Sequence, residues 1–230
     1  MSGRSPRWFT GIKYPYEANF ADNTWAQIIA ACQRGIVPET WAVGDQKAMT
    51  INGISYQIDI IGKNHDTYTA GGTAPLTFQM HECYHEKKRM NLAATNKGGW
   101  TSCDMRTKHL PGILSKMPTE VQSGIREVNK LTSAGNYSTT IVTTADKLFL
   151  LSEIEIFGIV DRSVNGEGTL YDYYKAAGSR IKTFNGTATV WRERSPSADY
   201  DSMFCTVYST GTSSQADANY DRGIAFAFCF

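Results

Sequence analysis

The segment GIAFAFCF at residues 223–230 constrains the fold of this chain more than any other. In an extended strand its isoleucine and three phenylalanines point to one side, and its two alanines and Cys229 point to the other. Both sides are apolar, so the strand is stable only where other parts of the protein cover both of its faces. The segment therefore predicts a central sheet strand that is buried on both faces.

A helix is predicted directly after residue 23. Apolar side chains repeat at helical spacing between Trp25 and Cys32. Asn23 or Thr24 can cap the start of this helix, and Gly35 can end it, because glycine readily adopts the left-handed conformation found there.

A hairpin is predicted next. The apolar run Ala48–Ile51 and the alternating segment Ile54–Ile60 are joined by Asn52-Gly53. This pair favours the two-residue turn in which both central residues have positive φ.

The other predicted elements are short. Strands are predicted at Leu76–Met80, Ile125–Leu131, Thr139–Thr143, Thr187–Arg194 and Met203–Thr210. Helices are predicted at Ser102–Leu110 and from Pro118 to Gly124, and Leu148–Phe157 is apolar enough to be buried in either state. With short helices early and strands late, the pattern predicts an α+β domain with a mainly antiparallel, twisted sheet.

Composition excludes several classes of protein. The chain has 230 residues, 41% of them apolar, and its 23 basic and 22 acidic side chains leave a formal charge of +1. No chain-wide field would attract nucleic acid, and no apolar run is long enough to cross a membrane. The first twenty residues lack the apolar core of a signal peptide, which predicts a chain that is made in and stays in the cytoplasm. Five irregularly spaced cysteines predict free, mostly buried thiols.

Residues 1–22 are predicted to form an extended arm, and residues 23–230 a single domain. The arm carries aromatic side chains between prolines and glycines, with neither helical nor strand periodicity. The assembly candidates in it are Trp8, Phe9, Tyr14 and Tyr16. Their rings would pack against the chain's own core or against a neighbouring subunit, and both alternatives stay open.

Seven ordered segments carry a family resemblance. They are NTWAQIIAACQRG, VGDQKAMTINGISYQIDIIGKNHD, GGWTSCDMR, TTADKLFLLSEIEIFG, WRERSP, FCTVYSTG and GIAFAFCF. In order and spacing they resemble a domain family of unknown function from phage and prophage tail proteins and Gram-positive surface proteins. That family is similar to the formylglycine-generating-enzyme branch of C-type-lectin-like folds. The resemblance implies a C-type-lectin-like fold over residues 23–230 and a virion setting.

The chain departs from the family pattern at two places. Trp191 and Arg194-Ser195-Pro196 match it, but Arg192 replaces a second tryptophan, and Ala225-Phe226 replaces an Arg-Pro pair. The resemblance therefore implies the lectin-like fold and the virion setting, and no binding site is transferred from it.

The sequence His81-Glu82-Cys83-Tyr84-His85 spells HExxH, the zinc motif of metallopeptidases. That chemistry needs a helix to bring both histidines to one face, and the motif directly follows the predicted strand Leu76–Met80. An exposed polar insertion is the favoured interpretation, and a zinc peptidase is kept as a remote alternative. No catalytic residue, metal or cofactor is predicted.

Two further chemistries are weighed and set aside. Cys205 and Cys229 alternate with apolar residues, which favours inert core cysteines. The late carboxylates and amide are calcium ligands by type, but no calcium-loop spacing links them, which favours solvated loop residues. These are Asp199, Asp201, Asp217, Asn219 and Asp221.

The late loops at 195–202 and 209–222 are rich in Ser, Tyr, Asp, Asn and Gly, the residue types of adaptable recognition surfaces. These types also simply make turns, and both interpretations stay open. The candidate ligand-binding residues are Tyr200, Tyr208, Tyr220, Asp199, Asp201 and Asn219.

The sequence thus suggests a non-enzymatic phage or prophage virion protein, assembled in the bacterial cytoplasm. Its lectin-like domain would recognise a host-surface glycan or protein, and its arm would anchor it to the particle. The alternative is a purely structural subunit for capsid decoration, a fibre base or a tail tip, which binds other virion proteins. A homo-oligomer, trimeric or higher, is expected, without nucleic acid binding or membrane insertion.

Overall fold

Helix α1 (Trp25–Arg34) forms where the sequence predicts it. In the computed structural model, which describes residues 16–176 and 178–230, the Thr24 hydroxyl accepts the Gln27 N–H at 3.2 Å. The Gln27 side chain accepts the Thr24 N–H at 2.8 Å, which completes a capping box. Gly35 ends the helix in the left-handed conformation, with φ of 66°. The predicted cap at Thr24 and stop at Gly35 are confirmed.

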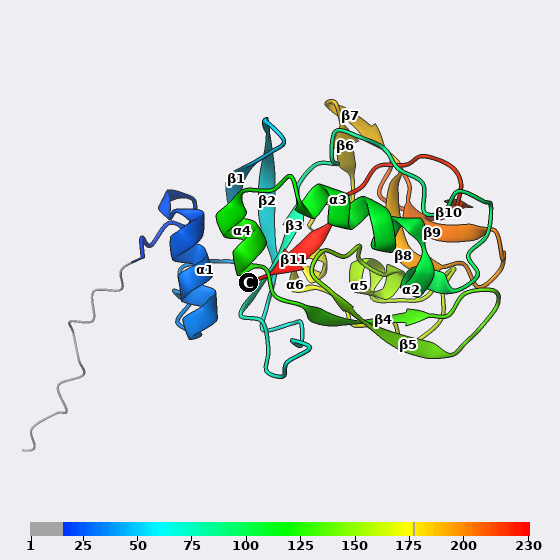
Figure 1. The fold of residues 1–230 in the computed structure, drawn as a ribbon, viewed down its shortest axis with the longest axis horizontal. Helices are drawn as coiled ribbons and strands as arrows, with labels where there is room; N and C mark the ends of the chain where they lie inside the picture. The colour runs from blue at the N-terminus through cyan, green and yellow to red at the C-terminus, as the bar shows by residue number, and fades with distance from the viewer. Residues whose placement is uncertain (1–15, 177) are drawn as a thin grey trace, which may run out of the picture.

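The predicted hairpin is present as β1 (Gln46–Ile51) and β2 (Ile54–Lys63). Asn52 and Gly53 have φ of 52° and 80°, as this turn type requires. Strand β2 also pairs with β3 (Leu76–Met80), which in turn pairs with β11 (Ala227–Cys229). The result is a four-stranded antiparallel sheet in the order β1-β2-β3-β11, with β11 in red in Figure 1.

The final strand is covered as predicted, but it is not central. Every residue from Ile224 to Phe230 is buried. However, β11 lies at one end of the sheet order, and its other edge forms isolated bridges, Ala227 with Phe149 and Cys229 with Arg126. These bridges satisfy backbone groups that a neighbouring strand would otherwise have bonded.

Short helices occupy the middle of the chain. They are α2 (Gly99–Ser102), the π-helical turn η2 (Met105–His109), α3 (Leu110–Leu114) and α4 (Thr119–Gly124). The predicted helix from Pro118 to Gly124 is confirmed as α4. The predicted helix Ser102–Leu110 is wrong in its bounds, because α2 ends where that helix should begin. Helical backbone instead runs from η2 directly into α3, and Pro111, which has no N–H, stands in the first turn of α3.

Three small antiparallel sheets complete the fold. β4 (Val128–Ser133) pairs with β5 (Ile141–Asp146), and β6 (Lys182–Phe184) pairs with β7 (Thr187–Thr189). The strands β8 (Trp191–Pro196), β9 (Met203–Val207) and β10 (Ser213–Asp217) form a sheet in the order β10-β9-β8. Helices α5 (Glu153–Phe157) and α6 (Asp172–Lys175) lie between β5 and β6 in sequence.

The α+β class is confirmed, and all paired named strands in the described part are antiparallel. The predicted order of short helices early and strands late is wrong, because β1, β2 and β3 precede α2. Several small sheets replace the single twisted sheet. The predicted strand Thr187–Arg194 is two strands, and Leu148–Phe157 divides into an irregular buried segment and α5.

Residues 16–22 pack against the domain. The 3-10 helix η1 (Phe20–Asp22) places Phe20 in the hydrophobic core, with its ring 5.4 Å from that of Trp41. The Tyr16 ring lies 6.1 Å from the Trp41 ring. The other arm candidates, Trp8, Phe9 and Tyr14, lie outside the described residues, so the arm itself stays a prediction.

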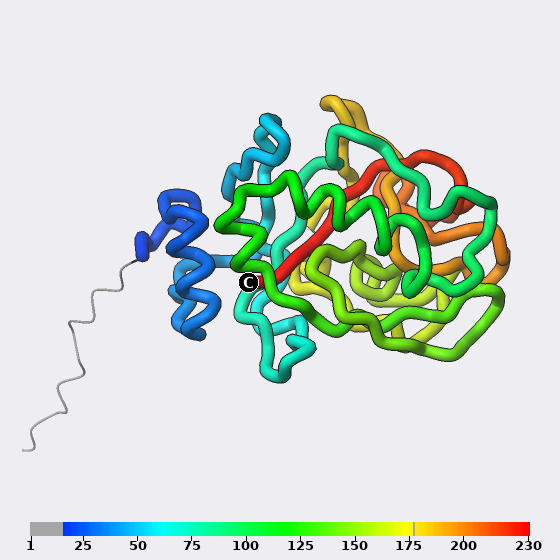
Figure 2. The backbone as a smooth tube through the Cα atoms, viewed as in Figure 1, coloured from blue at the N-terminus to red at the C-terminus, as the bar shows by residue number. Residues whose placement is uncertain are grey.

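The molecule is elongated. Helix α1 lies at one end, and the sheet β8–β9–β10 lies at the opposite end, as the blue and orange segments of Figures 1 and 2 show. Among the described residues, no helix has the length and apolarity needed to cross a bilayer.

Candidate functional site

The structure brings most of the predicted ligand-binding residues to one end of the sheet β8–β9–β10. Met203 opens β9 and pairs with Asp217, which closes β10. The loop before β9 and the turn after β10 therefore lie side by side, and the Ala218 N–H donates to the Ser202 carbonyl at 2.8 Å.

Five exposed side chains from these two loops form a surface, which we name the acidic-aromatic face. It consists of Asp199, Tyr200, Asp201, Asn219 and Tyr220. The two tyrosines are 49% and 51% exposed, whereas most aromatic rings in the described part of the chain are buried.

Tyr208 does not belong to this face. It follows β9 at the end where the chain turns into β10, and it is 48% exposed. Five residues of strand separate the two ends of β9, which corresponds to roughly 17 Å. The sequence grouped Tyr208 with Tyr200 and Tyr220, whereas the structure places it at the opposite end of the sheet.

Asn96 holds the first loop from beneath. It is fully buried, and its amide nitrogen lies 2.8–3.1 Å from the carbonyl oxygens of Ser197, Tyr200 and Met203. Its amide oxygen accepts the Asn136 N–H at 2.7 Å. The loop that displays Tyr200 is thus held by one side chain a hundred positions earlier, and sequence reasoning missed Asn96 because nothing local distinguishes it.

Arg192 holds the second loop. This buried guanidinium donates to the carbonyl oxygens of Ala216, Asp217 and Tyr220 at 3.0, 2.6 and 2.6 Å. Arg192 therefore fixes the turn beneath Tyr220. The Arg222 guanidinium lies 5.4 Å from the centre of the Tyr220 ring.

The HExxH segment is not helical. Residues 81–85 form bends and irregular backbone after β3, as the strand before them predicts. The His81 ring bonds to the buried Asp59 carboxylate at 2.9 Å, whereas the His85 ring lies 2.6 Å from the Tyr56 hydroxyl. The two histidines thus have separate partners rather than one shared face, and the bond to Asp59 raises the pKa of His81.

The five cysteines are free and buried, as predicted. Burial raises the pKa of Cys32, Cys83 and Cys103 to about 12, and it raises the pKa of Cys205 and Cys229 as well. Such thiols stay protonated and are poor nucleophiles.

The late acidic side chains do not form a metal-binding cluster. Over residues 16–176 and 178–230, no group of three histidine, cysteine, aspartate or glutamate side chains is arranged to hold an ion. Asp217 instead accepts the Ser202 hydroxyl at 2.9 Å, which ties the two loops of the face together.

A buried ionic network lies under the sheets. Arg194 contacts both carboxylate oxygens of Glu155, one at 2.9 Å, and Lys130 bridges Glu155 and Asp66 at 2.7 Å each. Burial alone would raise the pKa of Glu155, but Arg194 and Lys130 reverse this and hold it below its usual value. All these charged groups are paired, which offsets the cost of burying them.

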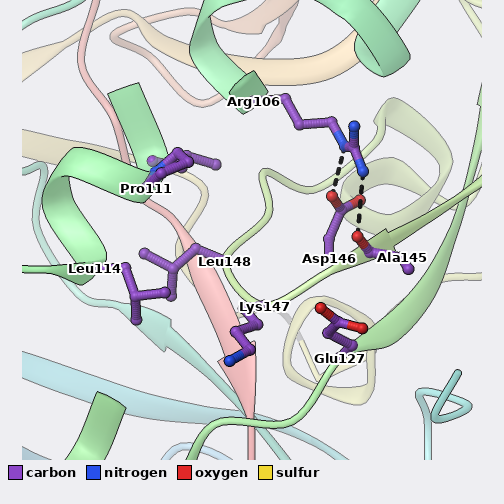
Figure 3. A pocket seen from close by; sticks show the side chains of 9 residues that line it. Arg106, Pro111, Leu114, Glu127, Ala145, Asp146, Lys147 and Leu148 are labelled. Atoms are coloured by element: carbon purple, nitrogen blue, oxygen red, sulfur yellow. Dashed lines mark hydrogen bonds and ion pairs between the residues drawn. The ribbon is translucent and has the colours of Figure 1, made fainter. Parts of the chain in front are cut away.

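Figure 3 shows an open pocket between α3 and the end of β5, with a volume of about 240 Å³. On its wall Arg106 donates to Asp146 at 2.6 Å and to the Ala145 carbonyl at 3.1 Å. A third nitrogen of the guanidinium donates to the Thr101 carbonyl oxygen at 3.0 Å. Lys147 and Glu127 also line the pocket.

Comparison with known proteins finds a family match for the later part of the chain. A family model described as a domain of unknown function, DUF6273, matches residues 74–230. No curated protein and no solved structure matches the chain.

Proposed function

The chain belongs to the DUF6273 family, and from this premise we propose that it is a non-enzymatic phage or prophage particle protein. Its late loops bind a host-surface glycan or protein, and the C-type-lectin-like assignment is part of the proposal. The N-terminal arm attaches a trimeric or higher homo-oligomer to the particle.

The acidic-aromatic face carries this proposal. Tyr200 and Tyr220 offer large, rigid rings with few rotatable bonds, which stack on sugar rings or apolar side chains at low entropic cost. Asp199, Asp201 and Asn219 offer acceptors and an amide donor for ligand hydroxyl or amide groups.

Preorganisation supports the same function. Asn96, Arg192 and the bond between Ser202 and Asp217 hold the two loops in place before any ligand arrives. A loop that is already ordered loses little conformational entropy on binding, so more of the contact energy contributes to affinity.

The shape of the molecule supports attachment through the N-terminal end and ligand binding by the late loops. The described chain begins beside α1, at the end opposite the sheet β8–β9–β10 (Figures 1 and 2). An attachment through the N-terminal end would therefore leave the acidic-aromatic face pointing away from the particle.

Binding of labelled protein to susceptible cells tests the face. We expect Tyr200→Ala and Tyr220→Ala each to weaken binding by about 2 kcal/mol, roughly 30-fold, as central aromatic anchors do. Tyr208→Ala is the matched control, because it removes an equally exposed tyrosine from the other end of β9 and should leave binding unchanged.

Equal losses from all three substitutions would contradict a ligand confined to this face. If the wild-type protein does not bind cells but still enters particles, the purely structural role is correct instead.

Removal of residues 2–15 tests the anchor. We expect the shortened chain to keep its thermal stability within a few degrees, because the contacts of Tyr16 and Phe20 with Trp41 remain. We expect it to lose oligomerisation or incorporation into particles, measured by light scattering and by particle composition. Full incorporation of the shortened chain would show that the anchor lies elsewhere.

A further inference from the structure

A small pocket lies next to the acidic-aromatic face. Three separate segments line it: Tyr84, Glu86 and Lys88 follow β3, Lys108 and His109 belong to η2, and Lys116 follows α3. Its volume is about 150 Å³. A water molecule takes about 30 Å³ of liquid, so the pocket has room for a group of several heavy atoms.

The Tyr84 side chain supplies an unused donor there. The residue is fully buried, and its hydroxyl has no hydrogen-bond partner among the described residues. Buried hydroxyls nearly always have a partner, so a ligand oxygen that entered the pocket and reached this hydroxyl would satisfy it. Burial raises the pKa of Tyr84 to about 12, which keeps the hydroxyl protonated and able to donate.

The charges around the pocket are mainly positive. The Lys88 ammonium pairs with Glu86 at 2.5 Å, and Lys108 pairs with Asp104 at 2.7 Å. Lys116 has no ion pair among the described residues, although its charge acts on Glu86 and helps lower the pKa of that carboxyl. Three ammonium groups thus face two carboxylates, which leaves one positive charge for an incoming anion.

Backbone hydrogen bonds join the pocket segment to the turn that carries Tyr220. Lys88 and Arg222 exchange two backbone hydrogen bonds, at 3.0 and 3.1 Å, and Arg222 lies two positions after Tyr220. The Met90 N–H also donates to the Ala218 carbonyl at 2.8 Å. The segment that lines the pocket and the turn that carries Tyr220 are therefore neighbours in the structure.

We propose that the pocket binds a phosphate group, and that the surface ligand of this protein is a phosphate-bearing glycan or polyol polymer. A phosphate oxygen accepts from the Tyr84 hydroxyl, while Lys116 and Lys88 contact the remaining oxygens. The proposal of a phosphate site depends only on the pocket. The proposal that the phosphate belongs to a surface polymer rests on the proposed function. The neighbouring Tyr220 then stacks on the sugar or polyol next to the phosphate.

Calorimetric titration of the full chain with inorganic phosphate at constant ionic strength tests the site. We expect saturable binding at one site, weakened about tenfold or more in Lys116→Ala and in Tyr84→Phe, as for lost hydrogen bonds to a charged group. Tyr84→Phe should fold normally, because the hydroxyl it removes has no partner in the protein. Lys147→Ala is the control, since it removes an exposed lysine outside this pocket.

Absence of saturable binding, or an equal loss in Lys147→Ala, would overturn the phosphate site. Adhesion to cells then separates the sources of phosphate. If Lys116→Ala weakens both titration and adhesion, the polymer is the source; if it weakens titration alone, free phosphate is the ligand and the polymer assignment is wrong. A wild-type protein that titrates with phosphate but adheres to no cell would contradict the proposed function while leaving the phosphate site intact.

Discussion

Arg194→Ala is expected to lower the free energy of unfolding by about 3–5 kcal/mol, the usual cost of breaking a buried ion pair. Arg194 is completely buried, and besides Glu155 it donates to the carbonyl oxygens of Leu131, Leu150 and Glu167. These contacts join β4, the segment before α5 and the loop around residue 167. Its removal leaves a buried carboxylate with Lys130 as its remaining ion-pair partner and three carbonyl oxygens without this donor.

Urea unfolding measures this loss as a lower midpoint at an unchanged slope. Arg194→Lys keeps the charge but lacks the planar guanidinium with its several N–H donors. We therefore expect it to lower the free energy of unfolding by an intermediate amount. The matched control is Lys175→Ala, which breaks the exposed pair with Asp172 at 2.9 Å and should cost about 0–1 kcal/mol. A loss for Arg194→Ala as small as the control's would mean that the network contributes nothing to stability.

Glu193→Gln is expected to stabilise the protein at neutral pH. Glu193 is buried, and neither carboxylate oxygen has a hydrogen-bond partner among the described residues. Burial, and then the nearby charges of Glu153 and Glu167, raise the pKa of Glu193 well above its usual value, although Arg194 acts in the opposite direction. The folded protein therefore keeps this carboxyl protonated over a pH range in which the unfolded chain has released the proton.

The sign of the pH dependence follows from this difference. The stabilising effect of a raised carboxyl pKa is complete below the unfolded value near 4.5 and is lost as the pH rises toward the folded value. Across that window the stability of the wild type should fall by about 1.4 kcal/mol per pH unit relative to Glu193→Gln.

Unfolding curves at successive pH values between 5 and 8 measure this slope. Glu120→Gln is the matched control, because Glu120 is exposed on α4, and its curve should run parallel to that of the wild type. Parallel curves for Glu193→Gln as well would show that Glu193 is ionised in the folded state.

Local elements of the fold could be predicted because their signals lie within a few residues. The cap at Thr24, the stop at Gly35 and the Asn52-Gly53 turn each depend on the backbone preferences of neighbouring residues. The region around η2 was predicted with the wrong bounds, because a π-helical turn before Pro111 has no simple periodic pattern.

The candidate site could be predicted only in part. Exposed tyrosines and acidic residues in late loops follow from composition, and Tyr200 and Tyr220 are indeed exposed. The separation of Tyr208 from them depends on the pairing of β9 with β10, and the supporting role of Asn96 depends on a contact across a hundred residues. Neither feature can be predicted from the residues that are neighbours in the sequence.

The sequence by itself determined which segments form helix, hairpin and buried final strand, because burial and backbone preference act residue by residue. Only the tertiary structure decided which loops share a surface, which buried charges find partners and where Lys88 meets Arg222. These outcomes depend on strand register and on contacts between residues far apart in the chain, and such contacts form only when the whole domain packs together.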